Sequence, residues 1–142
     1  MNGNVELLNY IYQNSQMGTV TIAQLLDIVE DAAFKSQLQS QYDEYKCIHE
    51  EARSLLNENG CDEKGISAFE KIRAYLMINM QTLTDKSSSH IAEMMIIGSN
   101  MGVIDAIKNL KKYKDAEPEI LSLMERLKAF EENNIRSLKD YL

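Results

Sequence analysis

Apolar and small residues recur along this chain at alternating spacings of three and four, the repeat that brings side chains to one face of a helix. The first run of this repeat is Val5, Leu8, Tyr12, Ser15, Thr19, Ile22, Leu26 and Val29. Because the 142 residues include one proline and six glycines, the chain favours long helices over a sheet with many turns. We therefore predict an all-α protein whose first helix spans about residues 4–30.

The same spacing restarts in a second stretch, which ends at Asn59-Gly60, a pair typical of a helix C-terminus. Its repeat positions are Leu38, Tyr42, Tyr45, His49, Ala52, Leu56 and Asn59. Because the connection is short, the two stretches should form an antiparallel hairpin that brings Ser15 near His49. Thr19 should then lie near Tyr45. The middle of this hairpin is thus expected to be polar.

The second half of the chain predicts further helices. A segment after Asp62 carries helical apolar spacing up to a break at about residues 84–88. A strongly apolar stretch then runs from Ile91 towards Tyr113. Without the break, a single helix of about 75 Å would result at about 1.5 Å per residue, about twice the length of the others. The last helix is expected to begin near Glu117-Pro118, since proline suits a first helical turn.

Composition narrows the class of protein. The length suits one domain, residues 1–142, and 44% apolar residues can bury a core. The 22 acidic and 15 basic residues give a net charge of −7, which disfavours nucleic acids and anionic membranes as partners. No stretch approaches the ~20 apolar residues of a membrane span, and no signal peptide is recognised. Cys47 and Cys61 are too far apart for a zinc motif, so we expect free thiols in a reducing cytoplasm.

Two helical hairpins joined by a helical connection of bundle length resemble the ferritin-like superfamily. The stretch at residues 91–102, Ile-Ala-Glu-Met-Met-Ile-Ile-Gly-Ser-Asn-Met-Gly, also looks like ferritin-like bundle proteins of bacteria. This resemblance covers most of the chain in its organisation. It implies an antiparallel four-helix bundle with an extra helical crossover between the second and third bundle helices. Because the local motif has no known chemistry attached, the resemblance predicts fold more than function.

The resemblance also implies which residues would form a metal site. In ferritin-like di-iron proteins, two helices each give a glutamate and the other two each give a Glu-x-x-His motif. This chain keeps His49 in the second helix and Glu131 in the last. Lys46 stands where the first motif needs its glutamate, and Asn134 stands where the second needs its histidine. The other two helices offer no carboxylate at this level, so neither an intact di-iron site nor another cofactor is expected.

Other side chains form candidate sites as well. His90 and Glu93 share a helical face and could supply two metal ligands or an acid-base pair, although a local ion pair at a helix start is the favoured explanation. Four apolar residues follow Glu93 and could bury it. A polar core layer that fixes helix register, or lines a small cavity, is predicted from Ser15, Thr19, Tyr42, Tyr45 and Asn134. Gly98 and Gly102, one turn apart, predict tight packing of a neighbouring helix.

Three hypotheses for function follow. The leading one is a non-catalytic ferritin-like bundle that acts through protein contacts as a homo-oligomer. Metal ligands are missing, and the segment after Asp62 together with the apolar stretch up to Tyr113 is more apolar than one bundle face requires. The alternative is a metal-binding or oxidoreductase relative that binds iron or another divalent metal. Its candidate ligands are His49, Glu131, Glu93 and His90. A third is a small apolar ligand held between helices in a cavity beside Tyr45 and Met101.

Overall fold

The structure is a computed structural model that describes residues 3–61 and 84–142. These residues form four long α-helices and a short 3-10 turn, with no β-strand among them. The elements are α1 (Asn4–Leu26), α2 (Ala32–Glu58), α4 (Ser88–Lys112), α5 (Pro118–Leu138) and η1 (Lys139–Tyr141). The predicted all-α class is therefore confirmed for the described part of the chain. The helix predicted after Asp62 lies outside the described residues.

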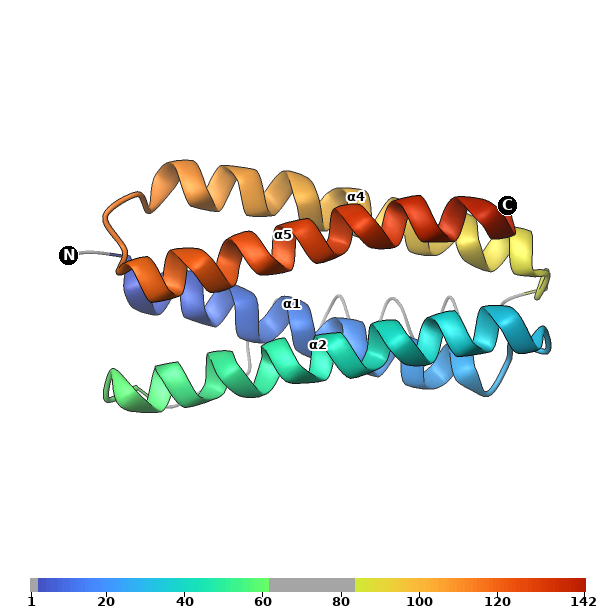
Figure 1. Ribbon diagram of the computed structural model, residues 1–142, viewed down its shortest axis with the longest axis horizontal. Helices are drawn as coiled ribbons and strands as arrows, with labels where there is room; N and C mark the ends of the chain where they lie inside the picture. Colours follow the sequence, from blue (N-terminus) through green and yellow to red (C-terminus); the bar gives the residue numbers. More distant parts are fainter. Residues whose placement is uncertain (1–2, 62–83) are drawn as a thin grey trace.

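The four helices lie side by side along the long axis of the molecule (Figure 1). α1 packs mainly on α2, and α4 mainly on α5, so the bundle consists of two hairpins with less extensive contacts between them. In each hairpin the two helices run in opposite directions (Figure 1). The end of α2 and the beginning of α4 lie at opposite ends of the bundle. The predicted crossover would join these two ends, but residues 62–83 lie outside the described part.

Local chemistry sets where the helices begin. The carboxylate of Asp31 accepts a hydrogen bond of 2.8 Å from the backbone N–H of Phe34, and the hydroxyl of Ser87 accepts one of 3.2 Å from that of His90. Such caps satisfy N–H groups that have no partner inside the helix. Pro118 occupies the first turn of α5, as predicted. Residues 84–87, which directly precede α4, are not helical, as expected for the predicted break.

The first helix is shorter than predicted. α1 ends at Leu26, about one turn before the expected residue 30. The chain leaves the helix at Asp27 and reaches the Asp31 cap through a short turn, in which the Val29 side chain is still buried. The repeat therefore identified a buried position correctly, while the helix itself had already ended.

The core is apolar and continuous across both hairpins. Its largest fully buried side chains come from all four helices and include Leu8, Ile22, Phe34, Leu38, Ile48, Leu56, Ile91, Ile120 and Met124. Complete burial of one such side chain is worth about 1.5–3 kcal/mol, so these contacts hold the bundle together. Six polar side chains are also buried in the described part: Asn4, Ser15, Gln41, Ser99, Glu131 and Asn134. These residues position the candidate sites.

Candidate functional site

Glu131 of α5 is a carboxylic acid in the middle of the core, with only 2% of the residue exposed. It faces Gly102 of α4, where any Cβ would clash with the carboxyl group of Glu131. The glycine therefore makes the space that the acid occupies. The pKa of Glu131 is raised to about 8, mainly by burial; a hydrogen bond with Asn14 opposes the rise and the charge of Asp105 adds to it. The carboxyl group is mainly protonated at neutral pH.

α1 places two polar side chains beside this acid. The Asn14 amide donates a hydrogen bond of 3.1 Å to the Tyr10 hydroxyl, which donates one of 3.3 Å to the backbone carbonyl of Gly102. Because Asn14 also hydrogen-bonds with Glu131, these contacts join α1 to both α4 and α5. Burial raises the pKa of Tyr10, so its hydroxyl remains a protonated donor.

α2 contributes Tyr45, which is buried. Its ring meets the ring of Phe130 edge-on, with centroids 4.7 Å apart, and it lies against Gly18, where a Cβ would come within 2.7 Å of the ring. Burial raises the pKa of Tyr45 and the nearby Glu131 adds to the rise, whereas hydrogen bonding with Ser99 and Asn134 opposes it. Side chains from all four helices thus meet here, and we call this group the polar centre. It comprises Tyr10, Asn14, Tyr45, Ser99, Glu131 and Asn134.

His49 lies beside Ser15, as the hairpin register predicted. Its Nδ1 is 3.1 Å from the carbonyl oxygen of Tyr12 and 3.4 Å from the hydroxyl of Ser15. Because a carbonyl oxygen only accepts hydrogen bonds, Nδ1 carries a proton in this arrangement. The imidazole ring also stacks on the ring of Tyr12, with centroids 4.2 Å apart. These contacts give His49 a place in the packing between α1 and α2.

The residues of the predicted polar layer differ in how far they are buried. Ser15, Tyr45 and Asn134 are buried, whereas Thr19 and Tyr42 are partly buried. The hydroxyl of Thr19 donates to the carbonyl of Gln16 within its own helix, and the close neighbour of Tyr45 on α1 is Gly18. The hairpin is therefore rotated slightly from the arrangement that the repeat predicted.

The second predicted pair lies at the beginning of α4. His90 Nδ1 is 3.9 Å from Glu93 Oε2, and the Glu93 side chain is 63% exposed. The burial considered for Glu93 among its apolar neighbours therefore does not occur. Within residues 3–61 and 84–142, no three His, Cys, Asp or Glu side chains lie close enough to hold a metal ion. Cys47 and Cys61 are free thiols, as predicted.

The outer side of α4 carries large apolar side chains in contact with water. We call these four residues the α4 outer face: Ile97, Met101, Ile104 and Ile107, which are 56%, 61%, 52% and 38% exposed. Gly98 also lies on the outside, and a Cβ there would meet nothing within 4 Å. The tight packing predicted at both glycines is therefore right for Gly102 and wrong for Gly98. The cavity predicted beside Tyr45 and Met101 is wrong too, because Met101 points away from the core.

Several residues of the polar centre were not predicted from the sequence. Tyr10, Asn14 and Ser99 do not fall on the repeat positions that were read as the buried side of each helix. A weak signal was present, because Tyr10 and Asn14 are four apart and thus neighbours on a helix. Ser99 gave no signal, since a single serine in an apolar helix is common. Their shared location depends on how the helices are rotated against one another.

Comparisons of the chain with protein-family models, with curated proteins and with solved structures found no match. The similarity to ferritin-like proteins therefore remains a prediction from the sequence. A search of the described helices found none with the length and apolar character needed to cross a bilayer.

Proposed function

We propose that this protein is a non-catalytic bundle of ferritin-like organisation that self-associates through the α4 outer face. The observation that carries the proposal is the exposure of Ile97, Met101, Ile104 and Ile107 along one side of a single helix. Contiguous apolar surface of this kind marks interaction sites more often than isolated apolar residues do. In a homodimer the same face of each copy packs against the other, which removes both faces from water.

The charges next to this face favour a second copy as the partner. Glu93 precedes the apolar residues, and Lys108 and Lys111 follow them, at spacings that keep all three on the same side of α4. If two copies of α4 pair in opposite directions, Glu93 of each copy lies beside the lysines of the other, and Ile97 packs near Ile104. A pairing in the same direction would place like charges together. Charge therefore favours the antiparallel dimer.

The polar centre supports a structural role for the interior. Its one carboxylic acid, Glu131, is mainly protonated at neutral pH, because burial raises its pKa to about 8. Its tyrosines are held protonated as well, because burial raises the pKa of both Tyr10 and Tyr45. These groups suit a hydrogen-bonded layer that fixes how the two hairpins pack.

The proposal is tested by measuring molar mass over a wide range of protein concentration, by sedimentation velocity. The wild-type protein should shift from monomer to dimer as concentration rises. The double variant Ile97→Gln/Ile104→Gln should remain a monomer, because it removes apolar surface while keeping good helix formers. Leu142→Gln is the matched control, since Leu142 is 60% exposed but lies outside α4, and it should dimerise normally. A wild-type protein that stays monomeric at millimolar concentration would rule the proposal out.

The orientation of the dimer has its own test. Glu93→Lys should weaken dimerisation, because each new lysine would face Lys108 and Lys111 of the other copy. The triple variant Glu93→Lys/Lys108→Glu/Lys111→Glu should restore it by exchanging both signs. Restoration in the triple variant supports antiparallel pairing. A triple variant that dimerises no better than Glu93→Lys would contradict the orientation and leave self-association itself unaffected.

A further inference from the structure

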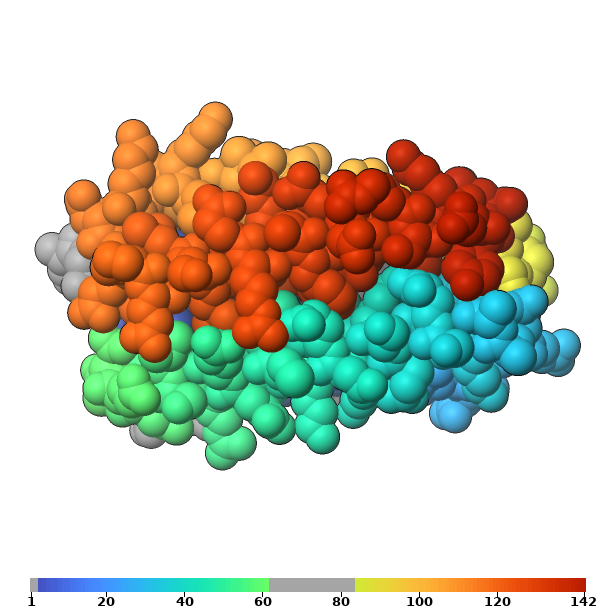
Figure 2. Space-filling view, viewed as in Figure 1, coloured from blue at the N-terminus to red at the C-terminus, as the bar shows by residue number. Residues whose placement is uncertain are grey.

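A groove of about 410 Å³ runs between α2 and α5. The two helices that line it lie on the face shown in Figure 2. Four of the lining side chains are carboxamides, namely Gln37, Gln41, Asn133 and Asn134, and Phe130 supplies an aromatic surface. The volume falls within the usual range for small-molecule sites, about 300–1,000 Å³. The groove is separate from the α4 outer face.

Two of these carboxamides are buried, and one of them, Gln41, lacks hydrogen-bond partners. Gln41 is 2% exposed, and neither its Nε2 nor its Oε1 has a partner. Asn134 is also 2% exposed, but its amide hydrogen-bonds with Tyr45. Buried polar atoms in folded proteins nearly always have a partner, so two unpaired atoms of one side chain beside a groove call for an explanation. A bound molecule that supplies the missing donor and acceptor would provide it.

The unpaired atoms define the chemistry of that molecule. Gln41 presents a donor and an acceptor side by side, and the group that matches both at once is another carboxamide with an N–H and a C=O on the same side. A primary amide has this arrangement, whereas the trans peptide group points its N–H and C=O in opposite directions.

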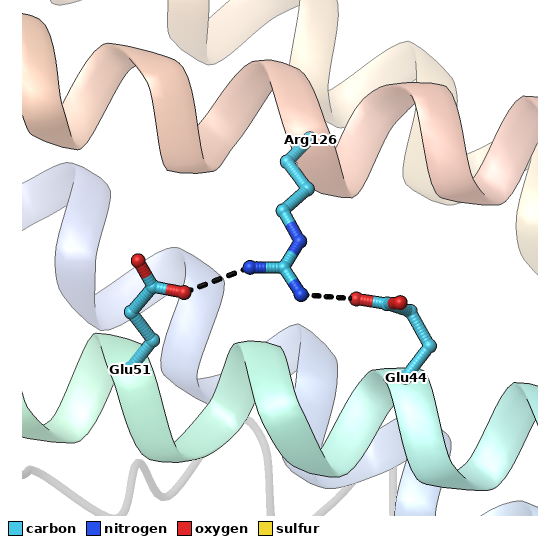
Figure 3. A network of polar contacts seen from close by, with 3 residues as sticks. All are labelled: Glu44, Glu51 and Arg126. Atoms are coloured by element: carbon cyan, nitrogen blue, oxygen red, sulfur yellow. Dashed lines mark hydrogen bonds and ion pairs between the residues drawn. The ribbon is translucent and has the colours of Figure 1, made fainter.

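The charges around the groove exclude an anion. Asp43 and Glu44 both line it, and the chain carries a net charge of −7. Figure 3 shows Arg126 of α5 placed between Glu44 and Glu51 of α2, so the guanidinium is occupied by these two carboxylates. A carboxylate ligand has acceptors and no donor, so it would leave Gln41 Oε1 without a partner. Asp43 would also repel its negative charge. A neutral ligand meets neither problem.

We propose that this groove binds a neutral small molecule that carries a primary carboxamide on an apolar or aromatic body. The amide pairs with both side-chain atoms of Gln41 in a two-hydrogen-bond ring, and the body lies against the ring of Phe130. The site lies apart from the dimer contact proposed above and does not depend on it.

Three ligands of nearly the same shape test this proposal in the wild-type protein. Benzamide carries the primary amide, N-methylbenzamide lacks the N–H on the carbonyl side, and benzoate carries the negative charge. Titrations followed by ¹H–¹⁵N correlation spectra should show benzamide shifting the Gln41 side-chain signals. The other two should bind at least about tenfold more weakly, since each leaves a buried polar atom unpaired. Equal shifts from all three, or no shift from benzamide at its solubility limit, would overturn the proposal.

Two variants test whether benzamide binds at Gln41. Gln41→Leu removes both unpaired atoms with little change in volume and should abolish the benzamide shifts. Asn57→Leu is the matched control, because it removes an exposed carboxamide from the same helix outside the groove and should bind benzamide as the wild type does. Binding of benzamide by Gln41→Leu at wild-type strength would overturn the proposal. The ligand series decides the matter in the wild-type protein even if Gln41→Leu folds poorly.

Discussion

Glu131 and Gly102 fit together because one of them has no side chain. The carboxyl group lies where a Cβ of residue 102 would stand, and the Tyr10 hydroxyl reaches the carbonyl of Gly102 from α1. Gly98, one turn earlier on α4, has open space instead. Two glycines with the same spacing signal thus have different physical roles, and only contact with α5 distinguishes them.

Replacing each glycine by alanine should therefore have opposite effects. Gly102→Ala should lower the free energy of unfolding by about 1–3 kcal/mol, because the new methyl group forces Glu131 out of its place. Gly98→Ala should raise it by about 0.5–1 kcal/mol, because alanine favours the helix and meets no neighbour. Urea denaturation of both variants measures the two changes. A destabilised Gly98→Ala together with a neutral Gly102→Ala would contradict the packing described here.

The helices differ in how firmly they are joined. Contacts are extensive inside each hairpin and sparser between α2 and α5, where Arg126 contacts two carboxylates of α2. Its guanidinium lies 2.5 Å from Glu44 Oε1 and 2.8 Å from Glu51 Oε2 (Figure 3). All three side chains are more than a third exposed, so water and salt screen these ion pairs. The apolar core therefore contributes more than these ion pairs to the free energy that holds the hairpins together.

Arg126→Met should accordingly change stability only slightly. We expect the free energy of unfolding to fall by no more than about 1 kcal/mol, since exposed ion pairs contribute little and methionine keeps part of the packing. The difference from wild type should shrink further in high salt, because salt screens the charges that remain. Urea denaturation at low and high ionic strength measures both effects. A loss of several kcal/mol that salt leaves unchanged would show that the bridge holds the hairpins together.

The helix boundaries were largely predictable, because they depend on local chemistry. Asp31, Ser87 and Pro118 act on their own backbone neighbourhood, so short sequence patterns locate the beginnings of α2, α4 and α5. The ferritin-like resemblance also predicted Glu131 as an inward-facing residue of the last helix, and this residue is buried in α5. Which side of α4 faces water was not predictable, because this helix is apolar nearly all round. Ile104 on its outer side and Ile91 on its inner side look alike in the sequence.

The residues around Glu131 were harder to predict for a different reason. Tyr10, Asn14 and Ser99 reach the polar centre only because four helices meet at particular rotations. A helical repeat fixes the rotation of one helix about its axis to within about one residue, or 100°, and neighbouring helices then decide the rest. Gln41 illustrates the same limit, because nothing in its neighbourhood in the sequence marks it as buried and unpaired.

Folding as a whole is linked to one proton through Glu131. In the unfolded chain this group titrates at its ordinary pKa of 4.5, whereas burial in the folded protein raises its pKa to about 8. Between these values the folded state holds a proton that the unfolded state has released. The contribution of Glu131 to stability is therefore fully present below about pH 4.5 and is lost as pH rises through about 8.

Glu131→Gln isolates this effect, because glutamine has the same shape and stays neutral at every pH. The difference in unfolding free energy, variant minus wild type, should rise between about pH 4.5 and 8 by at most about 1.4 kcal/mol per pH unit. The variant should therefore be the more stable of the two at pH 8. Urea denaturation at a series of pH values measures the difference. A difference that does not change with pH would show that Glu131 is not desolvated in the folded protein.

The contact between Gly102 and Glu131 also constrains how such a sequence can drift over evolutionary time. Residue 102 cannot accept a side chain alone, since a side chain there needs a shorter one at residue 131. The two codons should therefore vary together among descendants of a common ancestor, while the exposed Gly98 drifts freely. Distant relatives should be recognisable by a glycine in α4 paired with a long acid or amide in α5. Where that acid has become alanine or serine, the glycine is free to be lost.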